Sequence, residues 1–393
     1  MKKFKVFTIF LAIIFSLTNS ITFKVFAEES SVEIGNLYAL SAALIDGDTG
    51  RVLYEKEGNK VRPMASTTKI MTLIIALEYG NSDDIITVSS YASKMPAVKL
   101  GIREGEQYKL SDLYYSLMLE SHNDVAVAIA EHIGGDVKGF SAMMNKKAME
   151  LGLTNTYFIT ANGLDASDEF GTHSTTSIEL ARLMKYCVME SPKREEFKAI
   201  CQTPNYSFTD YEKNRSFDVS NKNAFLNMMD GVLAGKTGFT ADAGYCYVVS
   251  VTRDDRTLIV ALLGCGWPNN KSYKWKDTKT LLEYGFDNYN ITQITDSGTP
   301  MKNINIPNGT PLDNIDTYIN DYVSILIGKN ETIKLNYHIP MQILPPIRAG
   351  DIVGHIDILI NDKTFRTINV YVSSSIEVKD YKYYIKIILN TFF

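Results

Sequence analysis

Three short polar motifs follow one another along this chain, and together they could perform acyl transfer. They are Ser66–Lys69 (STTK), Ser121–Asn123 (SHN) and Lys236–Gly238 (KTG). Two serine hydroxyls and a lysine amine can supply a nucleophile, a proton relay and a base, and a second lysine can bind a carboxylate. Each motif alone is weak evidence, but their combination in this order predicts a nucleophilic serine site.

The first motif places a candidate nucleophile and a candidate base one helical turn apart. Ser66 opens the helix predicted over 66–79, and Lys69 lies on the same face. Burial lowers the pKa of a lysine, so a neutral Lys69 amine could accept the proton of Ser66. The helix N-terminus also favours the negative charge that develops there. A serine N-cap followed by a solvated lysine is the alternative, and it would be preferred for this motif alone.

The second motif is predicted to lie in a loop between two helical segments. Ser121 could relay a proton to a leaving amine, and Asn123 could bond both Lys69 and a substrate amide. A polar turn between helices is the alternative interpretation of this tripeptide.

The third motif is suited to an anionic substrate group. Lys236 offers a positive charge and Thr237 a hydroxyl for a substrate carboxylate, and Gly238 permits close approach of the backbone. The backbone N–H groups of Phe239 and Ser66 are candidate oxyanion donors. The motif is predicted to lead into a strand, and a β-turn before an edge strand is its non-functional interpretation.

Hydrophobic patterning predicts an α+β domain over 35–290, in which the two ends of the segment share one antiparallel sheet around a helical block. The predicted elements are a hairpin over 40–56, the helix over 66–79 closed by Gly80, helices over 112–119 with Ser111 as N-cap, 125–132, 141–151 and 177–189, strands over 245–252 and 257–263, and a helix over 278–289.

The last hundred residues change in character. Prolines punctuate short β-type runs, which predicts a small all-β domain over 291–375. The tail 376–393 can be drawn as an amphipathic helix with lysines on one face and Tyr, Ile, Leu and Phe on the other, which suits an anchor at a membrane surface. A final strand is the alternative, because residues 383–388 have good β-propensity.

The N-terminus predicts export. Residues 1–27 contain three early lysines, an apolar run and the sequence Val25–Ala27, as in a secretory signal peptide. The apolar run is shorter than the roughly 20 residues of a spanning helix, so removal is preferred over an uncleaved anchor. The mature chain is therefore expected at the extracytoplasmic face of the bacterial membrane, or secreted.

Composition argues against several other functions. The net charge of −5 and the lack of a concentrated Lys/Arg stripe make a nucleic-acid partner improbable. The four cysteines and five histidines form no CxxC motif, Cys/His cluster or HExxH motif, so neither a metal site nor a cofactor is expected. Cys246 and Cys265 could form a disulfide in an exported chain, and buried free thiols are at least as plausible an outcome.

The motifs and their flanks resemble low-molecular-mass penicillin-binding proteins of the serine-type D-alanyl-D-alanine carboxypeptidase group (peptidase S11-like), over about 37–290. The matching segments are PMASTTKIMT (63–72), the stretch from NGLD (162–165) through HST (173–175), GKTGFT (235–240) and AGYC (243–246). The resemblance implies a serine β-lactamase/DD-peptidase-like fold. It also implies an enzyme that removes the terminal D-alanine from peptidoglycan stem pentapeptides through an acyl-enzyme and is inhibited by penicillin and other β-lactams.

The resemblance also assigns roles to individual residues. Ser66, Lys69, Ser121 and Asn123 would be catalytic. Residues Lys236–Thr240 would bind substrate: Lys236, Thr237, Gly238, Phe239 and Thr240. The C-terminal β-domain would lift the catalytic domain off the membrane.

Two departures and three alternatives accompany this interpretation. His122 and Met64 stand where the family usually has small residues, and His122 could alter access or pH dependence. A class A-like β-lactamase usually needs a loop Glu for deacylation, and residues 154–165 contain none. An endopeptidase that cuts crosslinks and a non-catalytic cell-wall-binding homologue are the other two alternatives.

Overall fold

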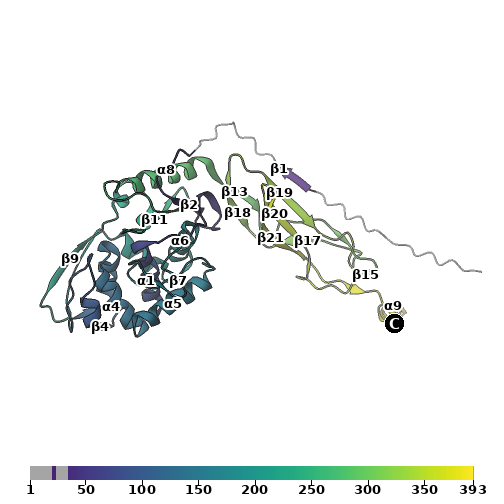
Figure 1. Ribbon diagram of the computed structural model, residues 1–393. Helices are drawn as coiled ribbons and strands as arrows, with labels where there is room; N and C mark the ends of the chain where they lie inside the picture. The colour runs from purple at the N-terminus through teal and green to yellow at the C-terminus, as the bar shows by residue number, and fades with distance from the viewer. Residues whose placement is uncertain (1–19, 24–33, 393) are drawn as a thin grey trace, which may run out of the picture. The chain divides into compact units, whose positions relative to one another are not determined.

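The computed structural model describes residues 20–23 and 34–392, which form two compact units (Figure 1). One unit spans 34–289 and carries all three motifs. The other spans 290–392 and includes the short strand β1 (Ser20–Phe23). Most of the predicted signal segment, with its proposed cleavage site, lies outside the described residues.

A five-stranded antiparallel sheet forms the centre of the first unit. Its strand order is β10 (Val232–Thr240), β11 (Gly244–Arg253), β12 (Arg256–Leu263), β2 (Ser41–Asp46) and β3 (Val52–Lys56). The N-terminal hairpin β2–β3 therefore pairs with β12 from the other end of the unit. The predicted α+β class with a shared sheet is confirmed.

Alternating side chains of the sheet pack against helices on opposite faces. Ile45 and Ile259 belong to the large buried cluster that contains α1 (Lys69–Tyr79). Leu44 and Leu258 lie on the other face, where both are close to Gly285 of α8 (Tyr273–Asn288). Neighbouring residues of a strand point to opposite faces of the sheet. Because helices cover both faces, nearly every residue of β12 is buried.

The helical block surrounds the buried helix α1. It contains α3 (Leu110–Tyr115), the π-helical turn η2 (Ser116–Glu120), α4 (Asn123–Gly134), α5 (Val137–Glu150), α6 (Ser177–Lys185), the π-helical turn η3 (Tyr186–Glu190) and α7 (Arg194–Gln202). Smaller elements are α2 (Ser90–Ser93), the 3₁₀ turn η4 (Ala224–Asn227), and the hairpins β4 (Ile85–Thr87) with β5 (Gln107–Lys109), β6 (Ser167–Asp168) with β7 (Gly171–Thr172), and β8 (Asn205–Thr209) with β9 (Ser216–Ser220).

Several predicted boundaries were wrong. Ser111 is not an N-cap, because α3 starts at Leu110 and its N-cap is Lys109, which makes no side-chain capping bond. Helix α8 begins at Tyr273 instead of 278, since the turn at 268–272 leads straight into it. The third motif lies inside strand β10 and not before it. Helix α7 and hairpin β8–β9 had no counterpart among the predicted elements, because their apolar residues are few and partly exposed.

The four cysteines, all in the first unit, are free and buried. Burial raises the pKa of each thiol, to about 12 for Cys201 and Cys246. Of the two outcomes considered for Cys246 and Cys265, the structure has free thiols.

The second unit is built of antiparallel strands. Its largest sheet has the order β1, β19 (Ile333–His338), β20 (Ile352–Ile360), β21 (Lys363–Val372) and β17 (Thr317–Ile319). Around it lie β13 (Tyr289–Thr295) with β18 (Val323–Gly328), β14 (Ile304–Asn305) with β16 (Asn314–Ile315), and β15 (Gly309–Thr310) with β22 (Glu377–Val378).

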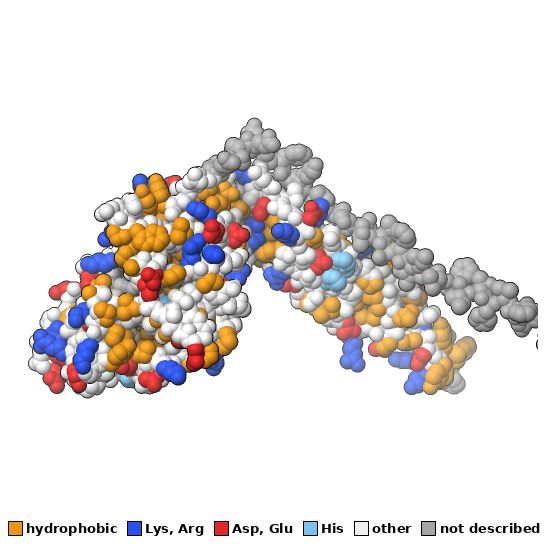
Figure 2. Space-filling model, viewed as in Figure 1, with side chains coloured by type: hydrophobic (Ala, Val, Ile, Leu, Met, Phe, Trp, Pro, Cys, Tyr) orange, Lys and Arg blue, Asp and Glu red, His pale blue; other side chains and the backbone are white. Residues whose placement is uncertain are grey.

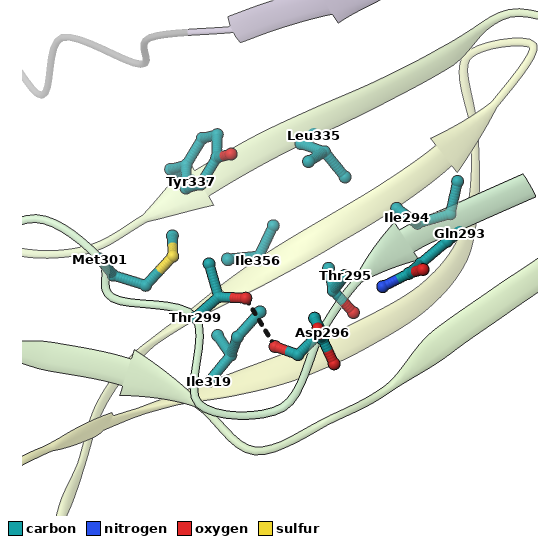
Figure 3. Close-up of a pocket in the computed structure, with 10 residues that line it drawn as sticks. All are labelled: Gln293, Ile294, Thr295, Asp296, Thr299, Met301, Ile319, Leu335, Tyr337 and Ile356. Atoms are coloured by element: carbon teal, nitrogen blue, oxygen red, sulfur yellow. Dashed lines mark hydrogen bonds between the residues drawn. The ribbon is translucent and has the colours of Figure 1, made fainter.

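A hollow of about 430 Å³ opens within this unit (Figure 3). Leu335 and Ile356 line it from the large sheet, and Ile294 lines it from β13. Thr299 closes a turn at its rim by donating a hydrogen bond to the carbonyl of Asp296 at 2.7 Å. None of its lining residues belongs to the three motifs.

The chain ends in helix α9 (Tyr381–Phe392), so the tail is helical and not a strand. None of its residues is buried, and its apolar side chains, among them Ile385 and Ile388, are exposed. Among the described residues, no helix is long and apolar enough to cross a membrane.

Candidate active site

Ser66 lies in a 3₁₀ turn, η1 (Ala65–Thr68), that leads directly into α1. Ala65 just before it has a φ of +49°, a conformation that non-glycine residues seldom adopt. Two hydroxyls hold the turn: Thr67 and Thr68 donate to the carbonyls of Met64 and Ala65 at 2.6 and 2.8 Å. The surrounding residues of the turn are buried while Ser66 is partly exposed, so its hydroxyl is presented at the surface of a rigid element.

Lys69 is fully buried, and its amine lies 3.0 Å from the Ser66 hydroxyl. Its Nζ also contacts the Asn123 side-chain oxygen at 2.9 Å and the backbone carbonyl of Asn162. A neutral amine has two N–H donors and one lone pair. The two oxygens can take the two donors, which leaves the lone pair for the proton of Ser66.

The charge state of Lys69 supports that role. Burial lowers its pKa well below the usual value, and the nearby Lys236 cation lowers it further. The buried carboxylate of Asp124 acts in the opposite direction. The net lowering favours a neutral amine, which is the form that can act as a base.

Ser121 ends the turn η2 with a left-handed backbone, at a φ of +68°. This geometry brings its hydroxyl within 2.9 Å of Lys236 Nζ. Asn123, two residues later, begins α4, and its amide donates to the carbonyl of Pro96 at 3.2 Å. The second motif thus contacts both of the others: Asn123 contacts Lys69 of the first motif, and Ser121 contacts Lys236 of the third.

His122 points away from these groups into the helical block. Its Nδ1 pairs with the hydroxyl of Ser116 at 2.8 Å, and its Nε2 lies 3.3 Å from a carboxylate oxygen of Glu120. Burial lowers the pKa of the imidazole below 6.5, with the Lys69 and Lys222 charges in the same direction. The side chain therefore holds the end of η2 in place, beside the backbone of Ser121.

The third motif occupies the edge strand β10. Lys236 is buried, which lowers its pKa to about 7, and it donates to the Thr237 carbonyl at 3.0 Å as well as to Ser121. Gly238 passes directly behind the nucleophile: a Cβ there would lie 2.8 Å from the backbone nitrogen of Ser66. Only glycine allows the strand to come this close to η1.

The last two predicted binding residues have different surroundings. Phe239 is exposed, and its ring centroid lies 4.7 Å from that of Tyr245 on β11. The Thr240 hydroxyl donates to Asp165 at 2.9 Å, so it also ties β10 to the loop that follows Asn162. The structure therefore brings the three motifs together at one place. Thr240 lies at the edge of this cluster, beside Asp165.

Three further residues support this arrangement and were not assigned a role from the sequence. The Asn162 carbonyl contacts Lys69, a backbone role that residue type cannot reveal. Asp124 accepts hydrogen bonds from the backbone of residues 100–102, next to the site. His173 Nδ1 accepts from the N–H of Ile159, so its Nε2–H donates to Thr68 at 2.8 Å; burial lowers its pKa to about 4. The available signals were the position of Asp124 beside the second motif and the resemblance of the stretch from Asn162 through His173 to a family segment.

Comparison with known proteins identifies two families along the chain. The family described as D-alanyl-D-alanine carboxypeptidase matches residues 27–266, and the one described as penicillin-binding protein 5, C-terminal domain, matches residues 289–378.

Individual relatives cover most of the chain. D-alanyl-D-alanine carboxypeptidase DacC of Escherichia coli (strain K12) is 30% identical over 378 residues, covering 90% of this chain and 88% of the relative. DacF of Bacillus subtilis (strain 168) is 28% identical, covering 80% of each. The crystal structure of penicillin binding protein 5 from Haemophilus influenzae superposes with a TM-score of 0.72 at 25% identity, over 88% of this chain and 100% of that one.

Proposed function

This chain belongs to the D-alanyl-D-alanine carboxypeptidase family, and on that premise we propose how its residues release the terminal D-alanine of a peptidoglycan stem pentapeptide. Its activity is that of a serine-type D-Ala-D-Ala carboxypeptidase that binds penicillin. The observation that carries the assignment of roles is the buried Lys69 amine, which lies 3.0 Å from Ser66 Oγ with two oxygens on its remaining sides.

Acylation starts at Ser66. Its Oγ attacks the carbonyl carbon of the penultimate D-alanine while Lys69 Nζ accepts the hydroxyl proton. The backbone N–H groups of Ser66 and Phe239 stabilise the oxyanion of the tetrahedral intermediate. The close approach of Gly238 to the Ser66 nitrogen supports this pairing of donors.

The leaving group departs through the second and third motifs. The C–N bond breaks as Ser121 passes on to the amine of the terminal D-alanine the proton that Lys69 took from Ser66, which returns Lys69 to its neutral form, and the contact of Ser121 with Lys236 supports this relay. Lys236 and Thr237 bind the terminal carboxylate of the substrate. Water then attacks the ester carbonyl, with Lys69 again as the base, and frees Ser66.

A Ser66→Ala variant tests the assignment. We expect it to lose D-alanine release from a pentapeptide, read by mass, and covalent labelling by a fluorescent penicillin. Ser272→Ala is the matched control, because this serine is exposed and makes no side-chain cap. Retained labelling in Ser66→Ala would overturn the assignment of the nucleophile.

The same reagents separate the alternatives. A stable penicilloyl adduct supports the peptidase and rapid turnover a β-lactamase. The absence of a Glu from residues 154–165 supports the peptidase. Incubation with a crosslinked peptide dimer tests the endopeptidase, and a failure of every β-lactam to acylate the chain would indicate a non-catalytic homologue.

The proposal includes export and a place at the membrane surface. Helix α9 supports it, because it combines exposed apolar residues, among them Ile385 and Ile388, with the basic residues Lys382 and Lys386. Ile388→Asp and Asn390→Asp each add one negative charge to α9, but only the first alters the apolar face. We expect only Ile388→Asp to abolish sedimentation with vesicles of phosphatidylglycerol and phosphatidylethanolamine. Equal sedimentation of both variants would contradict the anchor.

A further inference from the structure

A group of metal-ligating side chains lies on the large sheet of the C-terminal unit, away from the three motifs. His338 on β19 and His355 on β20 are directly opposite each other in the antiparallel register. Asp357 follows two residues after His355 on β20. Because alternate residues of a strand share a face, all three side chains are on the same side of the sheet.

The three side chains converge. His338 Nε2 is 3.2 Å from Asp357 Oδ2, and the two imidazole rings are stacked with their centroids 4.6 Å apart. One ligand atom from each residue lies within 4.8 Å of the others, and this is the one such cluster among the residues that the structure describes. Both histidines are exposed. Figure 2 shows histidine side chains, in pale blue, at the surface of the C-terminal unit.

The opposite face of this sheet is apolar and packs in the core of the C-terminal unit. Ile356, between His355 and Asp357, is buried in the core of the unit together with Ile358 and Ile368. The backbone that carries the cluster is thus held by packing, while the side chains of the two histidines are exposed to solvent. Zn²⁺ binds imidazole nitrogens and carboxylate oxygens at about 2.0–2.2 Å, and one ligand atom from each of the three residues already lies within 4.8 Å of the others.

A neighbouring hydroxyl orients the carboxylate. Thr367 on β21 is paired with Asp357, and its Oγ1 donates to Asp357 Oδ1 at 2.5 Å. The other oxygen, Oδ2, is then directed at His338. Such a hydrogen bond to a ligand is a regular feature of metal sites, where it fixes the ligand's orientation.

We propose that His338, His355 and Asp357 form a surface site that binds a divalent transition-metal ion, namely Zn²⁺. Two imidazoles and one carboxylate suit Zn²⁺, whereas Ca²⁺ and Mg²⁺ require mostly oxygen ligands. With three protein ligands, a fourth position stays open to water or to another ligand. The site is separate from the proposed catalytic residues and does not depend on their roles.

The register of β19 and β20 brings the three side chains together, although His338 is far from the other two in the sequence. The sequence therefore shows no metal-binding motif. His338 and His355 are separated by the whole β19–β20 connection, and the only local element is the alternate pair His355 and Asp357. The prediction from spacing alone was that the chain has no metal site, because a site built across two strands escapes a search for local motifs.

Zinc titration of the full chain tests the proposal. After treatment with a chelator, we expect wild-type protein to bind one equivalent of Zn²⁺ in competition with a chromophoric chelator at neutral pH. His338→Val and His355→Val, which keep strand propensity, should each weaken binding by at least about tenfold. Thr367→Val should weaken it by about tenfold because the carboxylate loses its orienting donor.

Matched controls make the result specific. Thr364→Val is the same change on the same strand β21 away from the cluster, and His132→Gln removes an exposed histidine beside Asp84 in the other unit. Both should bind Zn²⁺ as wild type does, and all five variants should keep penicillin labelling. Absence of binding by wild type, or equal binding by His355→Val and His132→Gln, would overturn the proposal.

Discussion

Replacement of Lys236 by methionine should stabilise the catalytic unit while it destroys the site. Lys236 is buried, and burial lowers its pKa from 10.5 to about 7. At 1.36 kcal/mol for each pH unit, this difference corresponds to about 5 kcal/mol of folding free energy. Methionine fills a similar volume without a charge to bury.

The sign of the pH dependence follows from the two pKa values. The unfolded chain keeps the Lys236 proton up to about pH 10.5, whereas the folded chain releases it near pH 7. The free-energy cost of burying the charged Lys236 amine is therefore present in full below pH 7. This cost falls as the pH rises from 7 to 10.5. Between pH 7.5 and 8.5, the free energy of unfolding of wild type should rise by about 1.2 kcal/mol relative to Lys236→Met.

Urea unfolding followed by tryptophan fluorescence measures this effect. Both tryptophans, Trp267 and Trp275, belong to the catalytic unit, so the signal reports that unit. Lys274→Met is the matched control: Lys274 is also buried, with a pKa lowered to about 8, but it makes no contact with the three motifs. Both variants should lose part of the pH dependence of stability.

Acylation separates the two variants. Lys236→Met should lower the second-order rate of penicillin labelling by about 10- to 150-fold, the cost of a charge-assisted hydrogen bond of about 1.5–3 kcal/mol. Lys274→Met should label at the wild-type rate. Equal pH dependence of stability in wild type and Lys236→Met, or unaltered labelling of Lys236→Met, would refute the reasoning.

Three further substitutions test the surroundings of Ser66 and Lys69. Asp124→Asn should lower the free energy of unfolding by about 2 kcal/mol, measured in urea, and move the acidic limb of the pH–rate profile to lower pH, because the carboxylate raises the pKa of Lys69; a limb that stays in place contradicts this. His122→Gly should change the pH–rate profile, because the imidazole holds the end of η2 beside Ser121 through its contacts with Ser116 and Glu120, and an unchanged profile would reject the role of His122. Gly238→Ala should reduce the labelling rate by about 100-fold, because its Cβ would displace β10 from the Ser66 nitrogen, and a wild-type rate would show that the strand can shift freely.

The sequence predicted the parts of the site that depend on local spacing. Ser66 and Lys69 are one turn apart on a helix, so their contact follows from helical geometry. The contact between Ser121 and Lys236 depends on how strand β10 meets the helical block, and chain spacing contains no information on it. Family resemblance supplied that link.

Other features have no signature in residue type. The Asn162 carbonyl on Lys69 is a backbone group, and its position depends on the path of the loop. The shared sheet was predicted because hydrophobic strands mark both ends of the unit. Helix starts such as that of α3 were missed because Lys109 makes no capping bond for a pattern to show.

The four buried thiols are natural probes of local unfolding in the catalytic unit. Each has a raised pKa and is at most 2% exposed, so an alkylating reagent can reach it only when the surrounding structure opens. Cys187 and Cys201 lie in the helical block, and Cys246 and Cys265 lie in or beside the central sheet. The order in which the thiols are alkylated under native conditions would therefore rank the opening free energies of these two layers without any introduced probe.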